Sequence, residues 1–199
     1  MTPKIATALE VFSGSPARSF PRGYRDPLRM QERLAALSKI KAIKAVEVAQ
    51  TDVSPEVPAK ELKRLLKDYG LACSGVSANL AYDRRFSLGA FGHQHPKTRN
   101  AAIDEGRKAV DLARQLGATE ITLRLYSDGF DYAFHIDYAV HWNTLISSIK
   151  TLAKYASPDV NVAIAYKGAE PRTFLTVSTV GKELSLCQAI EMKTVGVAL

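Results

Sequence analysis

The chain has 199 residues, 46% hydrophobic and 24% charged, which is enough length and apolar content to bury a core. No apolar run approaches the roughly 18 residues that a membrane span needs, and we expect no signal peptide. Lys and Arg number 27 against 20 Asp and Glu, but they are spread among acids over expected helix faces, so we expect neither nucleic-acid nor membrane binding.

Strand-like and helix-like segments alternate along the chain. Six apolar segments predict strands, at residues 4–12, 45–49, 71–76, 120–125, 160–165 and 195–199. Apolar residues at helical spacing predict five helices between them. The first begins at Asp26-Pro27 and the third at Pro96, while Gly70 and Gly117 end the second and third. The apolar face of the first helix is expected to consist of Leu34, Leu37 and Ile40.

Strict alternation of strand and helix predicts a parallel sheet of the α/β class. Loops that follow strands are long and polar, whereas loops that follow helices are short, which favours a (β/α) barrel. An open nucleotide-binding sheet is disfavoured because no glycine fingerprint follows the first strand. The prediction is therefore one domain over residues 1–199, a partial TIM barrel with about six strands and five helices.

Cys73 and Cys187 lie in apolar segments without metal-ligand or redox spacing. This usage indicates buried free thiols in a reducing compartment, so a cytoplasmic location is expected.

The stretch 160–172, VNVAIAYKGAEPR, carries the densest polar signal. It predicts a short buried strand followed by Lys167, Glu170 and Arg172, at the end of a parallel strand where sites are built. Ala165 stands at the last strand position, where an acid or a ligand would be expected.

Several separated motifs together resemble one family. They occur in the same order along nearly the whole chain: residues 22–27 (RGYRDP), 88–96, 128–132 (DGFDY) and 166–172 (YKGAEPR). These motifs are similar to those of the xylose isomerase-like TIM-barrel sugar isomerases and epimerases, particularly bacterial rhamnose/xylose isomerase-type members.

The resemblance implies a metal-dependent aldose–ketose isomerase acting on a small-molecule sugar. A divalent manganese, magnesium or cobalt ion, held by carboxylates and a histidine, would polarise the sugar oxygens. The resemblance also implies catalytic roles for two residues: His93 near the sugar ring, and Lys167 as a donor to a substrate oxygen. Four further residues are expected to bind substrate or shape its pocket: Asp128, Phe130, Asp131 and Arg172. An ion pair between Lys167 and Glu170, and a loop-bracing role for Arg172, are the alternatives.

Two departures from the family bear on activity. Ala165 stands where the family has a metal-binding glutamate, and the other family ligands would follow the sixth strand, beyond Leu199. A third, smaller departure is Arg124, at a position where the family usually has an aromatic residue. We therefore expect this chain to bind no catalytic metal and to lack isomerase activity.

Three alternatives remain from the sequence. One is a sugar epimerase of the same fold, which would need paired glutamates. Another is a phosphate-ester or abasic-site endonuclease of the same superfamily, which would need a histidine-rich zinc cluster. The third is a non-catalytic sugar-binding or interaction module. Six strands would leave the edges of the barrel unpaired. Association of copies into a homo-oligomer through these edges is a further expectation.

Overall fold

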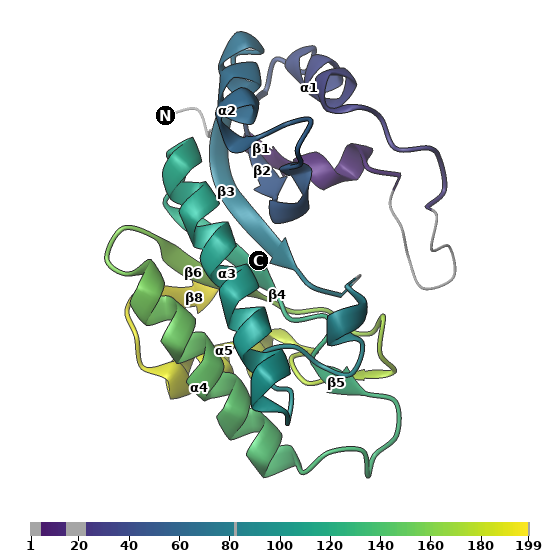
Figure 1. The fold of residues 1–199 in the computed structure, drawn as a ribbon, viewed down its shortest axis with the longest axis vertical. Helices are drawn as coiled ribbons and strands as arrows, with labels where there is room; N and C mark the ends of the chain where they lie inside the picture. The colour runs from purple at the N-terminus through teal and green to yellow at the C-terminus, as the bar shows by residue number, and fades with distance from the viewer. Residues whose placement is uncertain (1–4, 15–22, 82, 199) are drawn as a thin grey trace.

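The computed structural model describes residues 5–14, 23–81 and 83–198. Its main sheet has six parallel strands in the order β1-β2-β3-β4-β6-β8 (Figure 1). The strands are β1 (Ile5–Ala8), β2 (Ile43–Ala49), β3 (Ala72–Asn79), β4 (Glu120–Arg124), β6 (Asn161–Ala165) and β8 (Val195–Val197). The prediction of a partial α/β barrel with six strands and five helices is confirmed.

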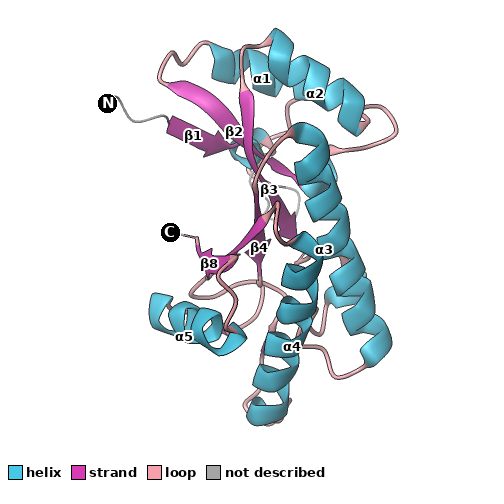
Figure 2. Cartoon of the chain, turned by 90° about the vertical axis from the view of Figure 1, so that its left-hand side faces the viewer, coloured by secondary structure: helices cyan, strands magenta, loops and turns pink. Residues whose placement is uncertain are grey.

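The α-helices are α1 (Met30–Ser38), α2 (Ala59–Asp68), α3 (Pro96–Leu116), α4 (Tyr138–Ala156) and α5 (Val180–Ile190). Short 3₁₀ helices are formed by η1 (Leu9–Phe12), η2 (Gln50–Asp52) and η3 (Arg84–Phe86). Figure 2 shows α3 and α4 lying along one face of the curved sheet, while the opposite face carries no helix of the described part of the chain. None of the helices within the described ranges is long and apolar enough to cross a membrane.

The core fills the space between the sheet and its helices. Alternate residues of β2, β3, β4 and β6 point into it and are almost fully buried: Val46, Val48, Val76, Ala78, Ile121, Leu123, Val162 and Ile164. Helices α3 and α4 pack closely where Gly106 meets Leu152, because a Cβ on Gly106 would lie 2.5 Å from Leu152 Cδ2. The remaining strand residues therefore face the side without helices.

The predicted bounds of the first strand and of the first helix are wrong. The strand ends at Ala8, and its expected last residues form η1 instead. Helix α1 begins at Met30 and not at Asp26-Pro27, because Arg29 is the N-cap and its N–H donates to Glu32 Oε2 at 2.8 Å. Ile40 follows the helix and is 46% exposed, so it does not belong to the apolar face.

The loops after β4 and β6 join in a small second sheet that the sequence did not predict. Strand β5 (Gly129–Phe130) pairs antiparallel with β7 (Phe174–Leu175). Only glycine fits at position 129, because a Cβ there would clash with the backbone oxygen of Phe174. The polar loops that follow β4 and β6 are thus held together.

Cys73 and Cys187 are free, as expected from their spacing. Both are partly exposed, which corrects the expectation of buried thiols. Tyr82 of the long loop after β3 lies outside the described residues.

Candidate functional site

The face without helices is lined by small and polar side chains at the carboxyl ends of the strands. Side chains alternate along a strand, so residues that neighbour the core positions must point to this face. Two rows of residues that pair across β3, β4 and β6 line this face: Ser77–Thr122–Ala163 and Asn79–Arg124–Ala165. In a (β/α) barrel this face is the interior, and its carboxyl end is where sites are built.

Arg124 spans this interior and holds two carboxylates. Its Nη1 donates to Glu10 Oε2 at 2.5 Å and its Nη2 to Glu47 Oε1 at 2.6 Å. Thr122 Oγ1 donates to the second oxygen of Glu47 at 2.8 Å. Burial lowers the pKa of Arg124, but the two carboxylates raise it by more, so the net shift is upward. The guanidinium therefore stays charged and ties β4 to β2 and to the segment after β1.

Ala165 lies directly beside Arg124 in the sheet and offers no ligand atom. Glu10 and Glu47, two acids of the interior, are both paired with the Arg124 guanidinium. The ion-pair partner of Glu47 is thus an arginine. Within the described ranges, no three His, Cys, Asp or Glu side chains are grouped so that they could hold a metal ion.

Lys167 lies just past β6 and pairs with Glu170, its Nζ being 3.5 Å from Glu170 Oε2. The ammonium also lies 5.3 Å from the centroid of the Tyr126 ring. Both members of the pair are more than a third exposed, so the ion pair stabilises little. Lys167 remains free to exchange Glu170 for another acceptor, and its contact with a substrate stays a prediction.

Asp128 is completely buried and connects two loops. Its Oδ1 accepts from the N–H groups of Ala90 and Gly92 at 3.0 and 2.7 Å, and its Oδ2 accepts from Phe91 at 3.2 Å. Burial raises the pKa of this carboxyl, whereas His141 and the three N–H groups oppose that shift. These contacts favour a role in positioning the loop after β3, and direct contact with a substrate stays a prediction without support from the geometry.

Asp131 and Arg172, predicted independently, form an ion pair across the small sheet. Arg172 Nη1 donates to Asp131 Oδ2 at 2.6 Å, and the N–H of Thr173 donates to Oδ1 at 2.8 Å. Next to this pair, the rings of Phe130 and Phe174 stack with centroids 5.3 Å apart. The alternative in which Arg172 braces its loop therefore has direct support.

The Asp131 carboxyl should titrate far below an ordinary aspartate. The Thr173 N–H and then Arg172 lower the pKa of Asp131 to about 2. A depressed carboxyl stabilises the fold above its unfolded pKa, about 4, and that contribution is lost as the pH falls toward 2. We expect NMR titration of the Asp131 carboxyl carbon to show this, and the midpoint to rise in Arg172→Met. An ordinary midpoint in the unaltered chain would contradict the pairing.

His93, Phe130 and Arg172 come together around one cleft of about 350 Å³. Burial and then the neighbouring His95 lower the pKa of His93, so its imidazole is mainly neutral at pH 7. Its Nδ1 accepts from the N–H of His95 at 3.0 Å. Lys167 does not line this cleft, so the two predicted catalytic residues are not brought together there.

Sequence reasoning overlooked Glu183 on α5. This side chain is fully buried, and its Oε2 has no hydrogen-bond partner within the described ranges, while Oε1 accepts from the N–H of Ala198 at 3.3 Å. Burial raises the pKa of Glu183. Helical spacing contained the signal, because position 183 is three residues after Val180 and four before Cys187 and so shares a helix face with these two apolar residues.

Known proteins share this fold. The chain is 25% identical to the xylose isomerase of Thermus thermophilus over 177 residues, covering 83% of this chain and 45% of that enzyme. A D-psicose 3-epimerase from Clostridium cellulolyticum is similar with a TM-score of 0.69 at 17% identity, over 85% of this chain and 57% of the other. A xylose isomerase domain protein from Alicyclobacillus acidocaldarius gives 0.62 at 16%, over 86% and 58%.

The two structural likenesses establish the fold alone, and the chain spans about half the length of these relatives. The family model described as "Xylose isomerase-like TIM barrel" matches residues 33–199, which is most of the chain. This match agrees with the parallel half-barrel and with the motifs at the carboxyl ends of its strands. The chain belongs to the xylose isomerase-like TIM barrel family.

Proposed function

We propose that this chain binds a sugar at the carboxyl end of its half-barrel and does not itself perform metal-dependent aldose–ketose isomerisation. The observation that carries the proposal is the pair Arg124 and Ala165. The Arg124 guanidinium binds Glu10 and Glu47, and the neighbouring Ala165 side chain is only a methyl group. Both residues lie at the strand ends, where the family is expected to bind its metal ion. The family membership and the sugar enzymes among the similar proteins support a sugar as the ligand class.

The residues present do not fit a divalent cation. Such an ion needs several oxygen ligands that are free to coordinate. Here one position is an alanine, and the two nearby carboxylates already neutralise a permanent cation. A metal ion close to Arg124 would also be repelled by its charge. The family's metal chemistry is therefore not assigned to this chain.

A sugar epimerase is the second candidate, because several similar structures are sugar epimerases by name. Epimerisation by paired glutamates would require two carboxylates that can take up and release a proton. Glu10 and Glu47 are the two glutamates that Arg124 brings together, and each accepts a hydrogen bond from it. This arrangement favours binding over proton transfer. The zinc-dependent endonuclease alternative is not supported, since its histidine-rich cluster is not found in the described part of the chain.

The proposal is tested by measuring binding and turnover on the same preparation. Titration calorimetry with a neutral aldopentose and a neutral ketohexose should give saturable binding that is unchanged by a chelator. Aldose–ketose interconversion should stay at the level of the protein-free blank with manganese, magnesium or cobalt added. Turnover that a chelator abolishes would overturn the proposal, and so would the absence of any sugar binding.

Ala165→Glu is the matched variant for this test. It restores a carboxylate at the end of β6, but it places that carboxylate beside the Arg124 guanidinium. We expect the new acid to join the ion cluster and the variant to remain without turnover.

Two further expectations stay predictions: association of copies through the edge strands β1 and β8, and a cytoplasmic location.

A further inference from the structure

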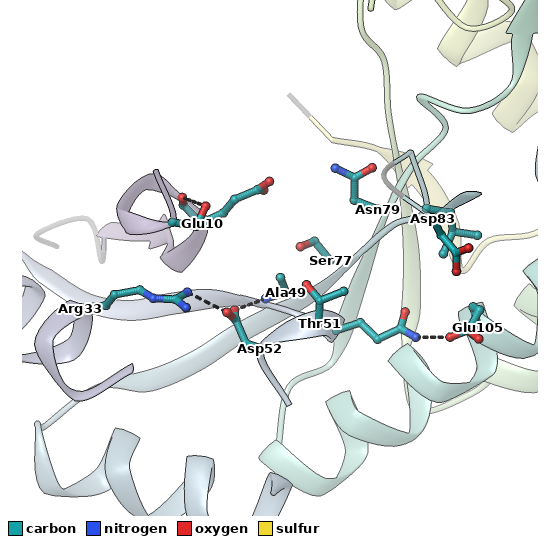
Figure 3. A pocket seen from close by; sticks show the side chains of 12 residues that line it. Glu10, Arg33, Ala49, Thr51, Asp52, Ser77, Asn79, Asp83 and Glu105 are labelled. Atoms are coloured by element: carbon teal, nitrogen blue, oxygen red, sulfur yellow. Dashed lines mark hydrogen bonds and ion pairs between the residues drawn. The ribbon is translucent and has the colours of Figure 1, made fainter. Parts of the chain in front are cut away.

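Two clefts formed by the loops after the strands differ in the charge of their walls. The larger, about 530 Å³, lies at the carboxyl ends of β1, β2 and β3, and Figure 3 shows Asp52 bonded to Arg33 in its wall. Each of its four acids pairs with an arginine or a lysine: Glu10, Asp52, Asp83 and Glu105. The smaller, about 350 Å³, is the cleft around His93, and none of the described residues that line it is an acid.

All four histidines of the chain line the cleft around His93. His93 and His95 come from the loop after β3, His135 from the loop after β5, and His141 from the start of α4. Arg172, from the loop after β6, completes the wall. Because the ionisable side chains of this wall are all bases, its positive charge grows as the pH falls through the range in which histidine titrates.

Several donors of this wall are available to a ligand. His93 Nδ1 accepts from the N–H of His95 at 3.0 Å, so the proton of the neutral His93 ring is assigned to Nε2, which can donate. His95 and His135 are exposed, and their ring nitrogens have no hydrogen-bond partner among the described residues. Arg172 donates to Asp131 through Nη1, which leaves Nε and Nη2 without an acceptor in the described ranges.

Three aspartates of the surrounding loops lie outside the lining of this cleft and already have partners. Asp128 is buried, accepts three backbone N–H groups and faces His141. Asp131 pairs with Arg172, and Asp137 is the N-cap of α4, where its side chain accepts a backbone N–H. Repulsion of an anion by these carboxylates is therefore offset by the groups that hold them.

His93 and His95 add to the positive potential at one side of the cleft. Burial lowers the pKa of His93 most, and the charges of His95 and Arg99 lower it further, against the opposing charge of Asp128. His95 is also the N-cap of α3, and its side chain caps no N–H group. The positive end of the α3 dipole thus lies at the same rim. An anion beside these rings would relieve the repulsion between them.

We propose that the cleft around His93 is a pH-dependent site for a small oxyanion, a phosphate or carboxylate group, bound by His93, His95, His135 and Arg172. The histidines take up protons as the anion binds, so the affinity rises as the pH falls. His141 is set aside, because its Nε2 lies 2.9 Å from Thr176 Oγ1 and its ring faces Asp128. A metal ion does not fit, since no three ligand side chains of the described ranges are grouped to hold one. The site goes beyond the proposed function and does not require that a sugar bind.

Calorimetry on the full chain with sulfate tests the proposal at constant ionic strength. Sulfate stays a dianion over the pH range used, so a change in affinity comes from the protein. Binding should be at least tenfold tighter at about pH 5.5 than at about pH 8. The double variant His95→Gln/His135→Gln, which alters two exposed rings, should lose most of this dependence. Lys182→Met, which removes the lysine of the adjoining cavity, should leave the affinity unchanged. An affinity that does not change with pH, or that depends on Lys182 and not on the histidines, would overturn the proposal.

NMR titration of the four histidine rings in the unaltered chain keeps the test valid if a variant fails to fold. Sulfate should move the titration midpoints of His93, His95 and His135 to higher pH, and that of His141 least. Equal movement with chloride at the same ionic strength would overturn the proposal, and so would binding of zinc ion at these rings more tightly than sulfate.

A comparison of inorganic phosphate with an aldopentose phosphate at one pH identifies the source of the oxyanion. Tighter binding of the sugar phosphate assigns the site to the phosphate group of an organic ester, and equal binding assigns it to the free ion. Absence of binding by sulfate and by both phosphates would overturn this inference and leave the proposed function intact. Failure of neutral sugars to bind would overturn the proposed function alone.

Discussion

The Arg124→Met variant is expected to lose about 2–4 kcal/mol of unfolding free energy, because the change removes one partner of a largely buried ion cluster. Arg124 is 18% exposed, and its carboxylate partners are 29% and 21% exposed. Methionine keeps most of the packing of the aliphatic stem but leaves Glu10 and Glu47 facing each other without a cation. Urea unfolding at pH 7, followed by circular dichroism, measures the loss directly.

Two controls separate the cluster from a general effect of removing an arginine. Arg64→Met removes an arginine that pairs with Glu61 and Asp68 on the exposed face of α2, so the urea midpoint should hardly move. Arg124→Lys keeps a positive charge but cannot reach both carboxylates with a planar fork, so its midpoint should fall between those of Arg124→Met and the unaltered chain. Equal stability of Arg124→Met and the unaltered chain would show that the cluster contributes nothing.

The regular elements of the barrel could be predicted from the sequence because their signals are local. Helix α3 begins at Pro96 and is followed by Gly117 in the left-handed conformation, as its sequence punctuation indicates. Strands β4, β6 and β8 are marked by apolar residues, and each was expected within two residues of its observed bounds. The end of the first strand was predicted wrongly because the apolar residues of 9–12 suit both a strand and a 3₁₀ turn that buries Leu9 alone.

The candidate site was less predictable because it depends on contacts between distant residues. Arg124 meets Glu10 across 114 positions of the sequence and Glu47 across 77. Glu10 lies in the segment that was predicted as the first strand, so no local pattern indicated that its side chain points toward Arg124. Similarly, the pairing of β5 with β7 joins loops about 45 residues apart. Local patterns indicate which residue types a loop carries, whereas the sheet register decides which of them meet.

Asp128 illustrates the difference between recognising a motif and knowing its role. The motif around it supported a role in the sugar pocket, but the carboxylate is buried under the loop that carries His93. It holds that loop because three successive N–H groups, of Ala90, Phe91 and Gly92, have turned toward it. Its effect on any ligand near His93 would therefore act through the position of the loop.

The Asp128→Ala variant is accordingly expected to lose about 4 kcal/mol, since it leaves three buried N–H groups without an acceptor. Asp128→Asn should lose about half as much, because its amide oxygen can still accept from two of the three while its NH₂ group faces the third. Asp104→Ala, which removes an exposed carboxylate that pairs with Arg107 on the surface of α3, is the control and should cost far less. Hydrogen exchange at Ala90, Phe91 and Gly92 identifies the cause, as these amides should lose protection in the Asp128 variants before the core does. If protection is lost uniformly over the sheet, Asp128 stabilises the whole fold and does not act as a loop anchor.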